Sequence, residues 1–361
     1  MDYLRTTKPS ESAAATDVLE DFSSSRAESR RVVLFVLGVG RSGSSALTRV
    51  LSLSGGTLPA GMRRADWNNP RGYWEPRETL SLNETILRQQ GSAGFDFSLR
   101  LLEDNGFDAD EKAACIAKMG TFLNGLPDAP IVVIKDSYIT NLSDMWFEAA
   151  RLSGLDVAAV IPVRDPHEVI ASQAAAGPMS PELTSAVWLK YSLLAERGTR
   201  GLPRVFVSYA NLLHDWRREL RRISTTLAVD LHPRDEQAIE EFLTPDLWHQ
   251  RHCGPVKERF GADWISAVYE AMLAAARDEP WDESVLDRVF EEYRVAEHDF
   301  RVASENYRAL VSMGVDRVYS NRVPFRPTIK KLVYQVVAKA RGRRALGPTF
   351  DRGRNEVDEA R

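Results

Sequence analysis

Cysteine is nearly absent from this chain of 361 residues, which carries only Cys115 and Cys253. Two cysteines exclude a disulfide-stapled scaffold and a zinc site built from cysteines, and they suit a reducing compartment. No run of about 18 apolar residues is present, so the sequence predicts no membrane-spanning helix. The N-terminal stretch lacks the apolar segment of a signal peptide. We therefore expect a cytoplasmic protein.

An excess of either charge is also missing, because 47 Lys and Arg stand against 51 Asp and Glu. Nucleic-acid-binding proteins usually carry a basic excess, so no nucleic-acid partner is expected. The six histidines show no metal-ligand spacing, and no metal is expected. A chain of this length with 43% apolar residues can bury a sizeable core without disulfides or metals.

Short apolar runs mark the expected strands. They are continuous and rich in β-branched residues, as expected of strands buried on both faces of a parallel sheet. Amphipathic stretches such as Leu47–Leu53 and Val187–Leu194 lie between them. This alternation predicts an α/β fold with a mostly parallel central sheet, whose ligands bind at the carboxyl ends of the strands. The four runs are Val32–Leu37, Ile131–Ile134, Val157–Val163 and Val205–Val207.

Composition divides the chain into four parts. Residues 1–30 are polar and aperiodic, and we expect a disordered tail there. All four apolar runs fall within 31–255, the expected α/β domain. A helical extension is expected over 256–320, and a basic tail over 321–361.

The extension is expected to hold two helices, Val256–Arg277 and Glu283–Val311, with Asp282 or Ser284 as the N-cap of the second. The second helix carries an apolar heptad stripe, which suits a helix that lies along another helix. That neighbour belongs either to the same domain or to a second copy in a homodimer. The stripe consists of Leu286, Val289, Tyr293, Ala296, Phe300, Ala303, Tyr307 and Leu310.

The C-terminal tail is strongly basic, with ten Lys and Arg and one acidic residue between Arg322 and Arg354. Such a tail is usually solvated. Its segment Lys330–Lys339 also places apolar residues between lysines, which suits an anionic lipid surface. Peripheral contact with the inner face of a membrane, through 322–344, is therefore the alternative expectation.

A glycine-rich loop, Gly38–Ser45, follows the first apolar run. A turn of this kind that opens a helix presents free backbone N–H groups and the positive end of the helix dipole, which favours an oxyanion. A dinucleotide fingerprint needs a second strand ending in an acid, and Ser54–Gly61 offers neither. A nucleoside-triphosphate loop needs a lysine where this chain has Ser44.

A third template fits better. The run Arg41-Ser42-Gly43-Ser44-Ser45 resembles the 5′-phosphosulfate loop of carbohydrate sulfotransferases. That resemblance implies a P-loop-like three-layer fold. It also implies transfer of a sulfuryl group from 3′-phosphoadenosine-5′-phosphosulfate (PAPS), without a metal, to a hydroxyl of a sugar, a glycolipid or another small molecule.

A second motif supports the resemblance. Arg164 follows the third apolar run, with Asp165 as a fitting N-cap, Pro166 as a fitting first helical residue, and Ser172 on the helix. An arginine with a serine eight residues later is similar to the 3′-phosphate motif of sulfotransferases. A guanidinium group binds phosphate through two parallel hydrogen bonds.

Further segments are similar to parts of the superfamily. Val207–Val229 resembles the segment whose tyrosine lies near the adenine, which implies that role for Tyr209. Asn69–Glu75 and Ile134–Asp136 resemble stretches of bacterial members. The resemblance extends over about residues 31–250.

Two residues depart from the pattern of small-molecule sulfotransferases. Ala46 stands where small-molecule sulfotransferases carry an adenine-stacking aromatic residue, and Ser137 stands where they carry a catalytic histidine. The acceptor site therefore does not carry over from them. The residues expected to bind the donor are Gly40, Arg41, Ser42, Gly43, Ser44, Ser45, Arg164, Ser172 and Tyr209.

The expected catalytic residues are Glu75, Lys135 and Arg41. The resemblance implies Glu75 as general base, and its neighbours Tyr73 and Trp74 offer an apolar setting that would raise the pKa of its carboxyl. Lys135 would neutralise developing charge. Alternative bases are Glu78, His167 and His252.

Other roles for these residues stay open. Glu75 could be a surface residue paired with Arg71 or Arg77, and Lys135 could pair with Asp136 or another acid. The competing functions are a nucleotide-dependent kinase and a non-catalytic assembly protein that binds 3′-phosphoadenosine-5′-phosphate (PAP).

Overall fold

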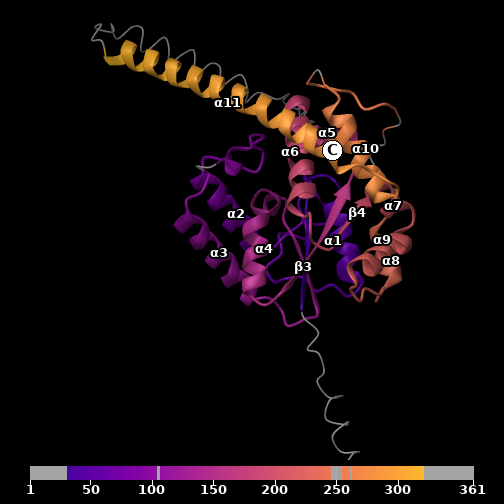
Figure 1. The fold of residues 1–361 in the computed structure, drawn as a ribbon. Coiled ribbons are helices and arrows are strands. Elements are labelled where there is room, and N and C mark those ends of the chain that lie inside the picture. The colour runs from indigo at the N-terminus through magenta and orange to yellow at the C-terminus, as the bar shows by residue number, and fades with distance from the viewer. Residues whose placement is uncertain (1–30, 104–105, 245–251, 253, 261, 321–361) are drawn as a thin grey trace, which may run out of the picture. The chain divides into compact units, whose positions relative to one another are not determined.

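The computed structural model describes residues 31–320 apart from 104–105, 245–251, 253 and 261 (Figure 1). The tails expected at 1–30 and 321–361 lie outside the described residues. The chain forms two compact units, Met1–His298 and Asp299–Arg361. Within the described part, no helix combines the length and apolar character needed to cross a membrane.

The first unit is built on a four-stranded parallel sheet in the order β2-β1-β3-β4. The strands coincide with the four apolar runs to within one residue at each end, and they confirm the predicted α/β fold class. Their bounds are β1 Val32–Val36, β2 Ile131–Lys135, β3 Asp156–Val163 and β4 Arg204–Ser208.

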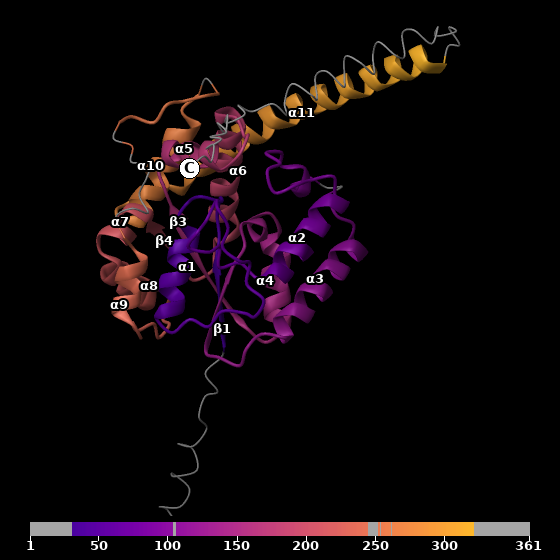
Figure 2. The same cartoon turned by 180° about the vertical axis from the view of Figure 1, so that it is seen from behind.

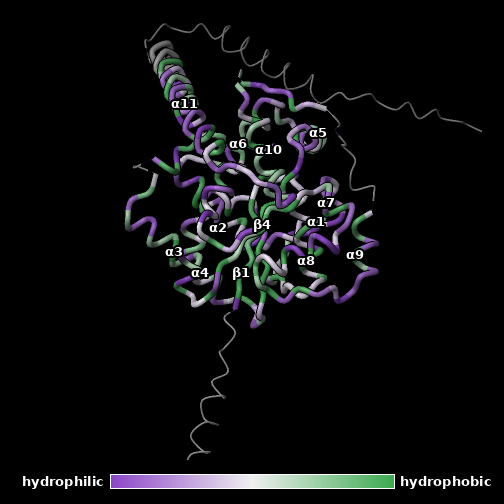
Figure 3. Tube along the Cα trace, turned by 45° about the vertical axis from the view of Figure 1, so that its right-hand side comes forward, coloured by the Kyte–Doolittle hydropathy of each residue, from purple (hydrophilic) through white to green (hydrophobic). Residues whose placement is uncertain are grey.

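Alternate side chains of each strand enter two different cores. In β1, Val33 and Phe35 join one core, while Leu34 and Val36 join the other. Because both faces are covered, the strands read as continuous apolar runs rather than as alternating ones. Figure 3 shows hydrophobic residues concentrated along the strands.

Helices cover both faces of the sheet, so the unit has three layers (Figures 1 and 2). One face is covered by α1 Ser44–Leu53, α7 Tyr209–His214, α8 Trp216–Leu227 and α9 Glu236–Phe242. The other is covered by α2 Arg77–Gln89, α3 Ala109–Asn124, α4 Ser143–Leu152, α5 Pro166–Ala176, α6 Pro181–Gly198 and α10 Trp264–Ala276. Two short 3₁₀ helices, η1 Arg100–Leu102 and η2 Ser137–Leu142, complete the unit.

The expected helix Val256–Arg277 begins later than predicted, at Trp264. The carboxylate of Glu258 accepts hydrogen bonds from the main-chain N–H groups of Ile265 (3.2 Å) and Ser266 (2.8 Å). A carboxylate that caps the first turn lies outside the helix, so Glu258 does not belong to it. The described residues 256–260 and 262–263 are accordingly not helical.

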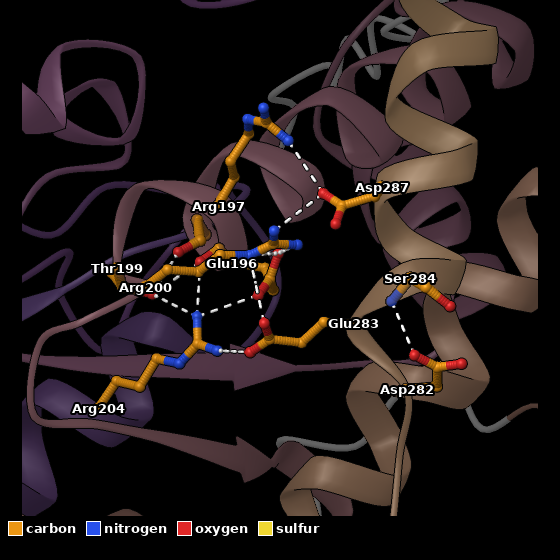
Figure 4. A network of polar contacts seen from close by, with 10 residues as sticks. Glu196, Arg197, Thr199, Arg200, Arg204, Asp282, Glu283, Ser284 and Asp287 are labelled. Atoms are coloured by element: carbon orange, nitrogen blue, oxygen red, sulfur yellow. Dashed lines mark hydrogen bonds and ion pairs between the residues drawn. The ribbon is translucent and has the colours of Figure 1, made fainter.

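Helix α11, Glu283–Ser320, begins at the predicted cap: the Asp282 carboxylate accepts the N–H of Ser284 at 2.9 Å (Figure 4). The first part of the heptad stripe, Leu286, Val289 and Tyr293, is buried in the core of the first unit. In the second unit, Phe300, Tyr307 and Leu310 are exposed. A homodimer contact there stays a prediction.

A buried carboxylate joins α6, β4 and the start of α11 (Figure 4). Glu196, which is 1% exposed, accepts hydrogen bonds from Arg200 (2.8 Å) and Arg204 (3.1 Å). Arg204 also donates to Glu283 at 2.7 Å, and Arg200 to Asp287 at 2.8 Å. Each buried charge has a partner of opposite sign, and these ion pairs offset the free-energy cost of removing the charges from water.

Candidate functional site

A cavity of about 610 Å³ opens at the carboxyl ends of all four strands. Its lining includes Arg41 from the loop after β1, Tyr138 after β2, Arg164 after β3 and Tyr209 after β4. This is the edge of a parallel sheet at which α/β proteins bind ligands.

The loop after β1 presents main-chain N–H groups to this cavity. Gly43 is the N-cap of α1, has φ +92° and offers no side-chain acceptor to the first turn of the helix. Arg41 also has a positive φ of 70°, which is uncommon for a residue with a side chain. The N-terminus of α1, lined by Ser44 and Ser45, is therefore suited to an oxyanion.

Arg41, which the sequence assigns to the 5′-phosphosulfate, lies together with Arg164 and Ser172, which it assigns to the 3′-phosphate. Arg41 Nε donates to Ser172 Oγ at 3.0 Å, and Arg164 Nη1 donates to the carbonyl of Arg41 at 3.0 Å. Burial, and next the charge of Arg164, lower the pKa of Arg41. Two adjacent guanidinium groups favour an anion between them.

Other residues hold the Arg164 side chain in position. Its Nε donates to Glu168 Oε2 at 2.9 Å, and its guanidinium lies 4.6 Å from the centre of the Tyr209 ring. Glu168 also accepts the main-chain N–H of His252 at 3.2 Å. The main chain at His252 thus helps to hold the Glu168 carboxylate that orients Arg164.

Lys135 and Glu75 form a buried ion pair at the cavity wall, and their side chains are 4% and 7% exposed. The ammonium group of Lys135 also donates to the carbonyl of Tyr73 (3.3 Å) and to Ser45 Oγ (3.5 Å). Glu75 Oε2 lies 3.5 Å from Arg63 Nη1. The predicted apolar setting of Glu75 is therefore wrong: two cations surround it, whereas the ring of Trp74 packs against Phe242.

Asp136, the residue after Lys135, is held by its own hydrogen bonds. It is fully buried and accepts hydrogen bonds from Asn83 Nδ2 (2.8 Å) and the N–H of Tyr138 (2.9 Å). Asn83 in turn accepts from Trp146 Nε1 at 2.9 Å. Burial, followed by the nearby charge of Glu75, raises the pKa of Asp136 to about 6.

Ser42 differs from the other loop residues expected to bind the donor. Its hydroxyl donates to the carbonyl of Val39 at 2.8 Å, and the side chain is buried away from the cavity. The remaining predicted donor-binding residues line the cavity: Gly40, Arg41, Gly43, Ser44, Ser45, Arg164, Ser172 and Tyr209.

The structure adds cavity residues to which no role was assigned from the sequence. Arg71 donates to the carbonyl of Phe242 and to Thr244 Oγ1, the latter at 2.7 Å. The Arg63 guanidinium lies 3.5 Å from the centre of the Tyr73 ring. Arg71 falls inside the stretch that resembles bacterial sulfotransferases, whereas no motif marks Arg63.

The alternative bases Glu78, His167 and His252 do not line this cavity. The two histidines stack at 4.2 Å beside Asp165, and these three side chains are close enough to share a metal ion. However, His167 Nε2 accepts the N–H of Lys257 at 3.0 Å, so the neutral ring carries its proton on Nδ1, the atom that faces Asp165. A carboxylate between two imidazole groups fits this arrangement better than a metal does.

Comparisons with known proteins give only distant matches. No family model and no curated protein matches the chain. A sulfotransferase domain from the curacin biosynthetic pathway is 15% identical, with a TM-score of 0.39, covering 70% of this chain and 99% of that one. A sulfotransferase domain of the Synechococcus PCC 7002 olefin synthase is 14% identical, with a TM-score of 0.37, and the match covers 73% of this chain and 95% of that one. A sulfotransferase of Alicyclobacillus acidocaldarius is 14% identical, with a TM-score of 0.35, and the match covers 73% of this chain and 99% of that one.

Proposed function

We propose that this protein is a sulfotransferase that moves a sulfuryl group from PAPS to a hydroxyl group of a small-molecule acceptor. The observation that carries this proposal is the convergence of three cations, Arg41, Lys135 and Arg164, with the N-terminus of α1 on one cavity. A carboxylate, Glu75, lies at the same wall. Anion binding and a base at one place are what sulfuryl transfer requires.

Each end of the donor has candidate partners. The N–H groups of Ser44 and Ser45, together with Arg41, would bind the 5′-phosphosulfate. Arg164 and Ser172 would bind the 3′-phosphate. The ring of Tyr209 lines the same part of the cavity and would contact the adenosine.

The chemistry is an in-line displacement at sulfur. Glu75 accepts the proton of the acceptor hydroxyl as its oxygen bonds to sulfur, and the bond from sulfur to the 5′-phosphate oxygen breaks, which releases PAP. Lys135 and Arg41 stabilise the negative charge on that oxygen. Since Lys135 pairs with Glu75 here, the acceptor hydroxyl has to enter between or beside these two groups.

Ligand-induced stabilisation tests the donor site. The protein is heated alone and with PAP, with AMP, and with ATP plus magnesium; a ligand at 100 times its Kd adds about 2.7 kcal/mol of stability. We expect PAP to raise Tm by several degrees and AMP to have little effect. Arg164→Ala should abolish the shift, whereas Arg294→Ala, which replaces an exposed arginine outside the cavity, should retain it.

Two results would contradict the proposal. A response to ATP with magnesium and none to PAP would favour a kinase. A response to PAP without sulfuryl transfer to any hydroxyl would favour the non-catalytic assembly protein.

The location and partners of this enzyme also belong to the proposal. We propose a cytoplasmic protein whose basic segment 322–344 contacts anionic lipid and in which the exposed stripe residues Phe300, Tyr307 and Leu310 support a homodimer. Co-sedimentation with anionic vesicles, with and without residues 322–361, tests the first contact. Light scattering of the full chain tests the second.

A further inference from the structure

Charge is unevenly distributed around the cavity. The cations Arg41, Arg71 and Arg164 line the part that holds the loop after β1, α5 and Tyr209. Tyr138 follows the edge strand β2, whereas Arg164 and Tyr209 follow β3 and β4 on the other side of β1. Together with Tyr138, the lining includes apolar and aromatic side chains that we call the apolar wall: Leu80, Phe95, Tyr138, Met179, Val187 and Tyr191.

The polar atoms of this apolar wall are largely engaged within the protein. The Tyr191 hydroxyl donates to the carbonyl of Gly94 at 2.7 Å and accepts from Asn141 Nδ2 at 2.7 Å. Thr184 Oγ1 donates to the carbonyl of Ser180 at 2.9 Å. Each hydroxyl hydrogen is therefore already used, and neither side chain can donate a hydrogen bond to a ligand without breaking one.

Asp136, which accepts a hydrogen bond from the main chain of Tyr138 in this wall, is also fully engaged. Asp136 has no exposed surface, and its carboxylate accepts from Asn83 and Tyr138. Besides Glu75, Lys135, Asp136 and Arg63, the described cavity residues outside the cationic part carry no charge. Lys135 is paired with Glu75, and Arg63 with Glu75 and Asp66, so a charged acceptor body would have to compete with an existing ion pair for a counter-charge.

Close packing and one exposed ring characterise the wall near Gly94. A Cβ on Gly94 would lie 2.0 Å from Tyr138 Cε1, so the ring of Tyr138 packs directly on that backbone. Phe95, the next residue, is 60% exposed and lines the cavity. An exposed phenylalanine at the edge of an apolar cavity is available for contact with a ligand.

We propose that the acceptor is an uncharged alcohol with an apolar body, and that this apolar wall binds that body. The inference rests on the proposed sulfuryl transfer, which places the reacting hydroxyl at Glu75. A sugar ring would bring several hydroxyl groups to a wall beside which the described residues offer few free polar atoms, namely Ser137 Oγ, the Tyr138 hydroxyl and Gln173 Oε1, since Gln173 Nε2 already donates to Met179 Sδ at 3.3 Å. The unpaired hydroxyl groups of the sugar would oppose binding. An apolar body has no hydrogen bonds to water to give up when it binds to this wall.

Three matched alcohols test this assignment. Cyclohexylmethanol and methyl β-glucopyranoside both carry a primary hydroxyl on a saturated six-membered ring, and differ in the polarity of that ring. The anion 4-(hydroxymethyl)cyclohexanecarboxylate adds one charge. Saturation-transfer NMR on PAP-loaded protein measures the binding of each alcohol without requiring turnover, and a calorimetric titration with PAP is made first.

We expect cyclohexylmethanol to bind about a hundredfold more tightly than the glucoside, the discrimination typical of an apolar site against added hydroxyl groups. The carboxylate should bind as weakly as the glucoside. Phe95→Ala should weaken cyclohexylmethanol at least tenfold and leave the Kd for PAP unchanged. Phe300→Ala, which replaces an exposed phenylalanine outside the cavity, should change neither value.

The outcomes separate the two proposals. Failure of PAP to bind contradicts the proposed function. If PAP binds, then preference for the glucoside or the carboxylate, absence of cyclohexylmethanol binding, or unchanged binding in Phe95→Ala each overturns the apolar acceptor.

Discussion

The backbone of Gly43 lies directly against the ring of Tyr209, because a Cβ on Gly43 would fall 2.2 Å from Tyr209 Cδ2. The loop after β1 and the residue that follows β4 are thus in van der Waals contact at the cavity. No other residue type fits at position 43 unless the Tyr209 ring moves.

Gly43→Ala should therefore weaken PAP binding at least tenfold in calorimetric titration, because the displaced ring disturbs the expected adenosine contact. Gly154→Ala is the control: Gly154 also has a positive φ, +72°, but nothing lies within 4 Å of the added carbon. Gly154→Ala should lower the free energy of unfolding by about 1 kcal/mol and leave PAP binding unchanged. Equal PAP affinity in both variants would contradict the expected role of this contact.

Glu75→Gln should lower kcat by about 10² to 10⁴, because the amide cannot accept the acceptor proton. PAP affinity should change little. The matched control is Glu78→Gln, an exposed carboxylate three residues later that does not line the cavity. Steady-state rates with PAPS measure both variants, and an unchanged kcat in Glu75→Gln would remove Glu75 as the base.

Asp136 should make stability fall as pH rises from about 4 to 6. Its pKa is raised from 3.8 to about 6, so in this window the folded chain holds a proton that the unfolded chain has released. The contribution of this carboxyl therefore declines by about 3 kcal/mol across the window and is constant above it. Urea unfolding of the wild type and Asp136→Asn at several pH values gives the difference; a difference independent of pH would refute the shift.

Glu196→Gln should destabilise the fold by about 3 to 5 kcal/mol, because it leaves the partly buried Arg200 and Arg204 without their shared carboxylate. Arg197→Ala removes an exposed ion pair with Asp287, 3.0 Å apart, and an approach of the guanidinium to the Phe290 ring at 4.4 Å. It should cost about 1 kcal/mol, comparable to other surface pairs. Chemical denaturation measures both. Similar losses in the two variants would show that burial of Glu196 is unimportant.

Local patterns in the sequence predicted the strands and the helix caps well. The apolar runs matched β1 to β4, and Asp165 caps α5 through the N–H of His167 at 2.8 Å, with Pro166 first in the helix. Both signals depend on residues within a few positions of each other, so sequence spacing is sufficient to find them.

Contacts between distant segments were not predictable in the same way. Lys135 and Glu75 are separated by 60 positions, and no local periodicity indicates that their charges meet. Arg63 joins the same pair from a loop without regular structure. The delayed start of α10 has a similar origin, because the carboxylate of Glu258 caps the first turn of the helix from outside it.

The carboxylate of Glu168 holds both the guanidinium of Arg164 and the main-chain N–H of His252. The strands are all complete by Ser208, whereas this last contact needs a residue more than forty positions later. On the ribosome, the sheet therefore emerges well before the arginine site acquires its full support. This site at the carboxyl ends of the strands is thus completed only after residue 252 has been synthesised.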